Sequence, residues 1–410
     1  MMFLIVLLNA AILAGTEGPL LQAHACGWSP PSTARHVVVR NTRELLQAVR
    51  AVEPQTTILL ENGVYALDRM LDLPVPGTVL RSRSGHRDDV TIRGSGMTEG
   101  LGVALSVSAA DVTIADLTVG FVRQHAVQVR GERAASRFTL HNVRLVDSGQ
   151  QLLKGSVGTD SRYADDGLVA CSLFEFTDTA PSSYTDGVDL LATKGWVIRD
   201  NEFRRIRGPR SAGYKAGPAI LVWANAQDTI VERNLIVDSF RGIALGLVPG
   251  TSPRARDGER RTDHQRGVVR NNVVCNRHEW ADEAIEANAS SDILIEHNTV
   301  LTAGAVTTWS IGIRYAATSG VVRNNLTTRP FLRRDGGSAD QSANIVDADE
   351  TWFVDAPACD LHLAGAANAA IDAAIVAPDA LLDFDRAERV GLPDIGAFEY
   401  RRSPGERPRR

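Results

Sequence analysis

The sequence predicts an all-β protein that folds as a parallel β-helix, a solenoid of stacked coils. One pattern, apolar-x-apolar-x-x-(Asn/Asp/Ser)-x-apolar, recurs eight times at intervals of 26 to 38 residues. A period of this length is typical of repeat architectures. The segments that carry it are short, rich in Val, Ile and Leu, and bounded by Gly, Asn and Asp, as strands are. No repeat contains the longer 3.6-residue periodicity that a helical solenoid needs.

The repeat has two parts, and its polar position is predicted to be part of the scaffold. The residues at that position are Asp116, Asn142, Ser172, Asn201, Asn234, Asn272, Asn298 and Asn325. A second short strand follows within most repeats. When coils stack, each strand pairs with its copies about 4.7–4.9 Å away. The polar residues then form a ladder at a turn, where Asn tolerates left-handed backbone and bonds neighbouring groups.

The N-terminal residues predict an exported protein. Residues 3–14 form an apolar run that is too short to span a bilayer, and Ala23-His24-Ala25 offers a cleavage site. Residues 1–25 are therefore predicted to be a secretory signal peptide, and the protein to be secreted or periplasmic. A lipid anchor at Cys26 is the alternative, and no later run is long enough for a membrane span. Export permits one disulfide, with its pairing left open, among Cys171, Cys275 and Cys359.

Both ends of the solenoid are predicted to be capped. Residues 42–53 have helical periodicity with Thr42 as the expected N-cap, and an amphipathic helix covers the open end of a solenoid. The β-helix is expected to span residues 36–343. Residues 344–400 lose the period and are predicted to form an irregular C-terminal cap. Residues 401–410 are charged and contain proline, which predicts a disordered tail.

The charge distribution favours an anionic ligand. The net charge is −5, which argues against a nucleic-acid binder. Residues 199–270 nevertheless contain 14 basic and 8 acidic residues, a local charge of +6, which leaves −11 for the rest. A basic middle on an acidic protein suits an anionic substrate, although these arginines could simply be solvated loop charges. The two enlarged loops, 204–217 and 249–267, lie where function usually sits beside a rigid scaffold.

The three lysines point to one region. Lys154, Lys194 and Lys215 lie within about 60 residues of one another, and the other 41 basic residues are arginine. Lysine supplies a titratable amine, which arginine does not. The repeat predicts outward positions, one per coil, on the second strand at Gln128, Asp189, Leu221, Ala244, Glu286 and Arg314. The turn that enters this strand carries Gln150, Asp186, Lys215, Arg241 and Glu283.

Taken together, the chain resembles the pectate-lyase-like right-handed parallel β-helix superfamily. The resemblance covers roughly residues 36–400 and rests on the repeat, the helix followed by ENGVY, and the closing DIGAFEY. It implies the right-handed coil and a polysaccharide substrate. Fold-level resemblance of this kind is analogy with respect to function.

The segment YTDGVDLLATK (184–194) resembles polysaccharide lyase family 6, the alginate lyases and chondroitinase B. In that family an acidic residue on the strand binds calcium and the catalytic lysine follows five residues later, a spacing that Asp189 and Lys194 match. The family's catalytic arginine lies one coil further on, where this sequence reads AILVW. Lys215 or Arg241 would therefore have to take its place.

The same segment resembles the TDGxD motif of polygalacturonases, through Thr185, Asp186, Gly187 and Asp189. The acids that this family places on the next coils are absent, because KAGP and FRG stand there. Inverting hydrolysis needs two carboxylates about 6.5–9.5 Å apart. Cations in place of those acids favour β-elimination on a uronic acid polymer, in which a cation or calcium neutralises the substrate carboxylate.

The residues predicted for this chemistry fall into two groups. The catalytic candidates are Lys194 or Lys215 as the base, Arg241 as the carboxylate neutraliser or leaving-group partner, and Asp186 and Asp189 as orienting groups or calcium ligands. The predicted substrate contacts are Lys154, Tyr184, Arg205, Arg207, Tyr214, Trp223, Glu283, Glu286 and Arg314. The two tyrosines are also possible acids. HEWADEAIEAN (278–288) forms a second acidic cluster, interpreted as substrate contact or structure.

These observations predict a secreted, monomeric polysaccharide lyase. It would act on an anionic, uronic-acid-containing polysaccharide, with calcium as the expected metal and no organic cofactor. A uronan C5-epimerase, a glycoside hydrolase on the same scaffold, and a non-catalytic carbohydrate-binding β-helix protein are the alternatives.

Overall fold

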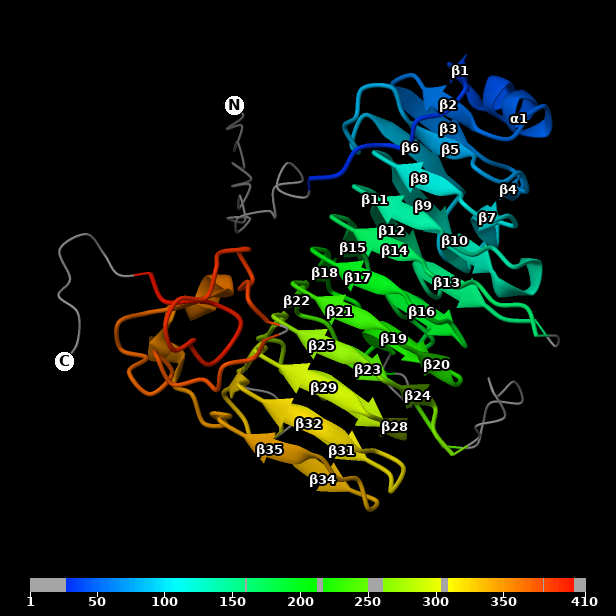
Figure 1. Cartoon of the computed structure of the whole chain (residues 1–410). Coiled ribbons are helices and arrows are strands. Elements are labelled where there is room, and N and C mark those ends of the chain that lie inside the picture. The colour runs from blue at the N-terminus through cyan, green and yellow to red at the C-terminus, as the bar shows by residue number, and fades with distance from the viewer. Residues whose placement is uncertain are drawn as a thin grey trace, which may run out of the picture.

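The computed structural model describes residues 27–158, 161–211, 217–249, 261–303, 309–378 and 380–401. These residues wind into a parallel β-helix with three long parallel sheets, and each complete coil contributes one strand to each sheet in turn (Figure 1). The fold predicted from the repeat is therefore confirmed. The signal peptide expected at 1–25, Cys26 and residues 402–410 lie outside the described residues.

The three sheets are built from strands of three to six residues, with one strand of two. The first sheet contains β1 (Arg35–Val39), β2 (Thr56–Leu60), β5 (Val79–Ser82), β8 (Thr113–Ala115), β11 (Thr139–His141), β14 (Leu168–Ala170), β17 (Val197–Arg199), β21 (Ile230–Glu232), β25 (Val268–Arg270), β29 (Ile293–Glu296), β32 (Gly320–Arg323) and β35 (Asp340–Ser342). The second contains β3 (Gly63–Ala66), β6 (Val90–Arg93), β9 (Thr118–Val122), β12 (Arg144–Ser148), β15 (Leu173–Glu175), β18 (Glu202–Arg204), β22 (Leu235–Val237), β26 (Val273–Asn276), β30 (Thr299–Thr302) and β33 (Leu326–Thr327). The third contains β4 (Leu71–Leu73), β7 (Val103–Val107), β10 (His125–Arg130), β13 (Leu153–Ser156), β16 (Val188–Leu191), β19 (Pro218–Trp223), β23 (Arg241–Leu245), β27 (Ile285–Asn288), β31 (Ile311–Arg314) and β34 (Leu332–Arg334).

The interior of the coil is filled by stacks of aliphatic side chains in register. One such stack on the third sheet consists of Val127, Leu153, Val188, Ile220, Ile243, Ile285 and Ile311, all fully buried. Side chains alternate between the two faces of a strand. The residues next to this stack therefore point outward, and they form the face on which the candidate site lies.

A helix covers the N-terminal end, as predicted. Helix α1 (Thr42–Arg50) is shorter than the expected 42–53, and its N-cap is Asn41 rather than Thr42. The side chain of Asn41 accepts a hydrogen bond from the backbone N–H of Glu44 at 3.0 Å, and the Glu44 carboxylate accepts one from the N–H of Arg40. This reciprocal arrangement satisfies donors that the first turn leaves free.

An asparagine ladder joins the first sheet to the second. The amide of each member donates to the side-chain oxygen of the next at 2.9–3.0 Å, through Asn201, Asn234, Asn272, Asn298, Asn325 and Asn344. The scaffold role predicted for these asparagines is confirmed, but the left-handed backbone falls on the preceding residue of each, for example Asp200 and Asn271.

Two members of the predicted ladder were assigned one position too early. Asp116 and Asn142 themselves have positive φ, and their backbone N–H groups donate to the strand-end carbonyl one coil on, as that of Asp200 does. They therefore correspond to Asp200 and not to Asn201. The short polar motif alone did not distinguish these neighbouring positions.

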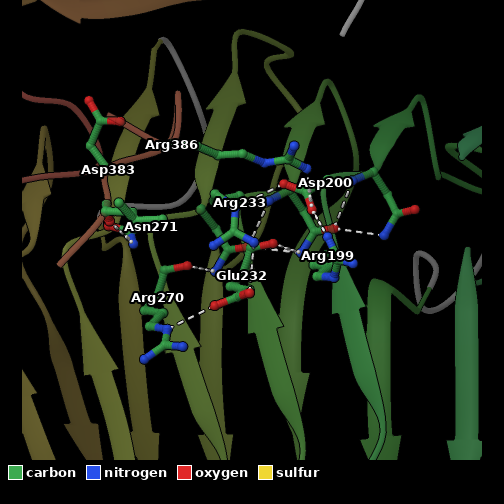
Figure 2. A network of polar contacts seen from close by, with 12 residues as sticks. Arg199, Asp200, Glu232, Arg233, Arg270, Asn271, Asp383 and Arg386 are labelled. Carbon is green, nitrogen blue, oxygen red and sulfur yellow. Dashed lines mark hydrogen bonds and ion pairs between the residues drawn. The ribbon is translucent and has the colours of Figure 1, made fainter. Parts of the chain in front are cut away.

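A row of alternating charges runs along the first sheet. Five residues on successive coils stand in register: Arg199, Glu232, Arg270, Glu296 and Arg323. The guanidinium of Arg270 pairs with Glu232 at 2.9 Å, as Figure 2 shows, and that of Arg323 pairs with Glu296 at 2.9 Å. We call these five residues the charge ladder.

The chain leaves the coil after β35 and forms an irregular cap against the corner between the first and second sheets. The cap contains two short 3-10 turns, Glu350–Trp352 and Ala356–Ala358, and the antiparallel strands β36 (Phe353–Asp355) and β37 (Asp360–Leu363). A disulfide between Cys275 and Cys359 links the cap to β26. It is one of the pairings that the sequence allowed. Arg386 pairs with Asp200 at 2.9 Å (Figure 2).

No helix in the described part of the chain is long and apolar enough to cross a membrane.

Candidate active site

The outward face of the third sheet carries a row of side chains, one per coil. Strand register places in this row Gln128, Lys154, Asp189, Leu221, Ala244, Glu286 and Gly312. The prediction for the last coil was wrong, because Arg314 stands opposite Asn288 and Gly312 stands opposite Glu286. Lys154 occupies a place in the row directly beside Asp189, which the sequence pattern did not reveal.

Lys154 lies at the centre of a polar cluster. Its ammonium forms an ion pair with Asp189 and donates a hydrogen bond to the hydroxyl of Tyr184 at 3.2 Å. The indole N–H of Trp223 donates to the second oxygen of Asp189 at 2.8 Å. Burial disfavours the charged amine, but Asp189 and Tyr184 outweigh it and raise the pKa of Lys154. Lys154 is thus a fixed cation at neutral pH.

Asp186 precedes strand β16, close enough to feel the charges of Asp189 and Lys154, and is almost completely buried. Burial, followed by the nearby carboxylate of Asp189, raises the pKa of Asp186 well above its usual value. Gln151 donates a hydrogen bond to Asp186 Oδ2 at 3.1 Å, whereas Oδ1 has no hydrogen-bond partner among the described residues. Gln151 thus takes the position beside Asp186 for which the sequence suggested Gln150.

Gly217 leaves the space that the Asp186 carboxyl occupies. A Cβ at this position would lie 1.7 Å from Asp186 Oδ1. We therefore expect Gly217→Ala to displace the buried carboxyl and to destabilise the fold by roughly 1–3 kcal/mol, the usual cost of overpacking. Urea unfolding measures this. Gly102→Ala is the control, because its Cβ meets first the side-chain amide of the half-buried Gln124. Equal stability of the two variants would contradict the expectation.

A second cluster lies further along the same sheet. The Arg241 guanidinium donates two hydrogen bonds to Asp282, from Nε at 3.0 Å and from Nη2 at 2.8 Å. Its Nε also lies 3.3 Å from Glu286 Oε1. Glu283 is paired with Arg334. We call these five residues the arginine–acid cluster.

Two carboxyl groups in the arginine–acid cluster hold protons unusually tightly. Burial, and then the charge of Glu286, raises the pKa of Glu283 to about 7. Burial also raises the pKa of Glu286, which accepts a hydrogen bond from Asn288 at 2.9 Å. Burial alone would lower the pKa of Arg241, but the carboxylates of Glu286 and Asp282 raise it. Arg241 therefore stays charged, while Glu283 titrates near neutral pH and the pKa of Glu286 lies above its usual value.

The structure does not bring Lys194 to Asp189. Strand β16 ends at Leu191, and Ala192 then takes a left-handed conformation. Lys194 belongs to the following turn, where it pairs with Gln227 in a parallel bridge. Its ammonium lies 3.8 Å from Asp228 and is half exposed. A spacing of five residues after Asp189 therefore does not by itself place a lysine in the groove.

The other predicted residues divide between the groove and its surroundings. Arg205 follows β18 of the second sheet and pairs with Glu175 at 3.2 Å, which places it away from the third sheet. Burial lowers the pKa of Arg207, although the charge of Asp238 acts in the opposite direction. Lys215 and Tyr214 lie outside the described residues, so their roles stay predictions.

The sequence analysis missed His125, Gln151 and Arg334 as neighbours of the predicted groups. Gln151 lies two residues before Leu153 and Asp186 lies two before Val188, and these two aliphatic residues pair in register. Aligning the strands by their inner aliphatic residues would have found it. His125 is buried, and burial followed by the charge of Lys154 lowers its pKa to about 4.

The described residues do not assemble a calcium site around Asp186 and Asp189. Both oxygens of Asp189 are engaged, by Lys154 and by Trp223, and calcium takes six to eight oxygen ligands. No group of three or more His, Cys, Asp or Glu within the described residues could hold a metal ion. Calcium dependence stays a prediction, and no step below uses the ion.

Comparison with known proteins finds similarity in structure. No family model matches the sequence. No curated protein matches it either. The crystal structure of pectate lyase Pel9A matches with a TM-score of 0.56 and 15% identity, over 90% of this chain and 97% of that one. The likeness shows the fold, a parallel β-helix, as the sequence predicted.

Two further solved structures match less well. An alginate lyase from Paenibacillus sp. str. FPU-7 has a TM-score of 0.43 and 12% identity, over 76% of this chain and 99% of that one. A mannuronic acid specific polysaccharide family 6 lyase from human gut microbiota has a TM-score of 0.42 and 11% identity, over 76% of this chain and 74% of that one.

Proposed function

We propose that the chain is a polysaccharide lyase that cleaves an anionic, uronic-acid-containing polysaccharide by β-elimination. The observation that carries the proposal is Lys154, a buried and permanently charged ammonium on the outward face of the third sheet, beside the half-exposed Tyr184. A long β-sheet face suits an extended polymer. A lyase with such a substrate would be secreted or periplasmic, because these polymers occur outside the cytoplasm.

In this proposal Lys154 binds the carboxylate of the sugar that reacts. Proton removal from C5 places negative charge on that carboxylate, and a fixed cation is worth most where charge develops in a site shielded from water. Asp189, held by Trp223, orients Lys154. The C5 proton passes to the base, the C4=C5 double bond forms, the C4–O4 bond breaks, and the leaving oxygen takes up a proton.

Tyr184 is our candidate for the group that exchanges the proton. Its hydroxyl is bonded to Lys154 at 3.2 Å and its side chain is 45% exposed, so it is within reach of a bound polymer. General acid–base groups must lie within hydrogen-bond reach of the proton that they transfer. Lys215 remains the alternative base that the sequence indicates.

A glycoside hydrolase is the second candidate, favoured by one observation. The carboxyl of Glu283, with a pKa of about 7, could donate a proton at neutral pH. The acids on β16 and β27 are separated by three strand spacings, however, which is about 14 Å. This exceeds the separation of about 6.5–9.5 Å that inverting hydrolysis uses. The lyase is therefore preferred.

The test is the ultraviolet absorbance of the unsaturated uronate that β-elimination creates. Purified protein is mixed with alginates, pectates and glycosaminoglycans, in calcium and in EDTA. We expect absorbance to rise with one polymer, and loss of that rise in EDTA would establish a metal requirement. New reducing ends without absorbance would indicate the hydrolase, and a changed C5 configuration by NMR would indicate the epimerase. Binding without any chemical change would leave a carbohydrate-binding protein.

A further inference from the structure

The arginine–acid cluster lies along the same third sheet as Lys154, but several strands further on. Strands β13 and β23 are separated by three strand spacings, about 14 Å, so Arg241 would meet a different unit of a bound polymer. The sequence assigned Arg241 to neutralise a substrate carboxylate. In the structure, Arg241 is already paired with Asp282 and Glu286. A substrate carboxylate would therefore have to compete with these acids for the guanidinium.

The charges in this cluster do not cancel. Three carboxyl groups, Asp282, Glu283 and Glu286, share two guanidinium groups, Arg241 and Arg334. With every group ionised the cluster carries a charge of −1, and with one proton on the glutamate pair it is neutral. An incoming carboxylate meets repulsion in the first state and much less in the second.

The packing keeps the proton on the glutamates. Glu283 and Glu286 are only 2% and 4% exposed, whereas the Asp282 side chain is 25% exposed. Glu283 lies against Gly312, where a Cβ would approach its carboxylate to 2.5 Å. The other charged groups that act on this cluster are Arg314, which is paired with Asp335, and the distant Asp186.

We propose that ion pairing within the cluster of Glu283 and Glu286 keeps Arg241 from binding an anion while both glutamates are ionised. An anionic polysaccharide then binds Arg241 together with the uptake of one proton by this pair. The inference rests on the proposed function, because it assumes a carboxylate-bearing ligand in the groove. Below about pH 7 the Glu283 carboxyl already holds a proton, so Arg241 is available. Above it Glu283 is ionised, so binding has to be accompanied by proton uptake.

The test is calorimetric binding of uronate oligomers, of the polymer type that absorbance or binding screens select, to the full chain. A Tyr184→Phe background slows turnover. Measurement in buffers of different ionisation enthalpy counts the protons taken up. We expect about one proton per bound oligomer near pH 8, almost none near pH 5.5, and affinity that falls up to tenfold per pH unit above about pH 7.

Glu283→Gln removes the titrating charge but keeps an oxygen that can accept from Arg334. We expect this variant to bind at pH 8 as tightly as the parent does at pH 6, with little proton uptake. Asp335→Asn is the control, since Asp335 pairs with Arg314 outside the glutamate pair, and its pH dependence should match that of the parent. Circular dichroism checks that each variant is folded.

The outcomes separate the two proposals. Tight binding with the same affinity across this pH range and no proton uptake overturns the inference and leaves the lyase standing. Proton uptake that persists in Glu283→Gln also overturns it. If no uronate oligomer binds at any pH, the proposed function fails, and the inference fails with it.

Discussion

Replacement of Lys154 by methionine should lower the rate of product formation roughly 10²–10³-fold, the usual cost of losing one group that stabilises developing charge. Methionine keeps most of the length of the side chain but removes the cation that Asp189 and Tyr184 share. The substrate carboxylate then has no fixed positive charge beside it. Initial rates from the absorbance assay give the effect, and kcat should fall more than KM rises.

Lys194→Met is the matched control for this prediction. Lys194 is half exposed and pairs with Asp228 beyond the end of the groove strand, so its replacement should change the rate less than about twofold. Comparable losses in both variants would contradict the assignment of the active lysine. A loss in Lys194→Met alone would restore the role that the family 6 spacing suggested.

Replacement of Asn272 by alanine should destabilise the protein by roughly 3–5 kcal/mol, because several buried groups lose their partners at once. The Asn272 amide donates to the Asn298 side chain at 3.0 Å and to the Val231 carbonyl at 2.9 Å. Its oxygen accepts from both the backbone and the side chain of Asn234. Water does not reach this turn, since Asn272 is fully buried.

The end of the ladder supplies the comparison. Asn344 is only half buried, and water can replace its hydrogen bonds with Asn325 after substitution by alanine. Asn344→Ala should therefore cost only about 1 kcal/mol. Urea unfolding of both variants measures the difference. Equal losses would contradict the expectation, because they would show that burial does not decide what each asparagine contributes.

The repeat predicted the fold well because one residue pattern determines the same local structure on every coil. Strands, turns and the asparagine ladder all follow from the spacing of small sets of residues. The same logic placed Asp189 and Glu286 on the outward face, where they are found. It failed for Arg314, because the inner isoleucines of SIGIRY, Ile311 and Ile313, place Gly312 and not Arg314 opposite Glu286.

The site was harder to predict because its partners come from different coils. Lys154 and Asp189 are 35 residues apart and meet only through strand register. The position of Lys194 depends on the left-handed turn at Ala192, which no local motif announces. The sequence also could not show that Arg241 is paired with acids. That prediction needs to know that the three nearby acids are packed against it and are not solvated.

The charge ladder on the first sheet gives this part of the solenoid a parity. Arginine and glutamate alternate from coil to coil, so the repeat that matters there is two coils long although each coil folds as one unit. Deleting a single coil would bring two arginines or two glutamates face to face, whereas deleting a pair would restore the alternation. A misaligned coil during folding meets the same penalty. Coils in this stretch can therefore be gained or lost in evolution most easily in twos.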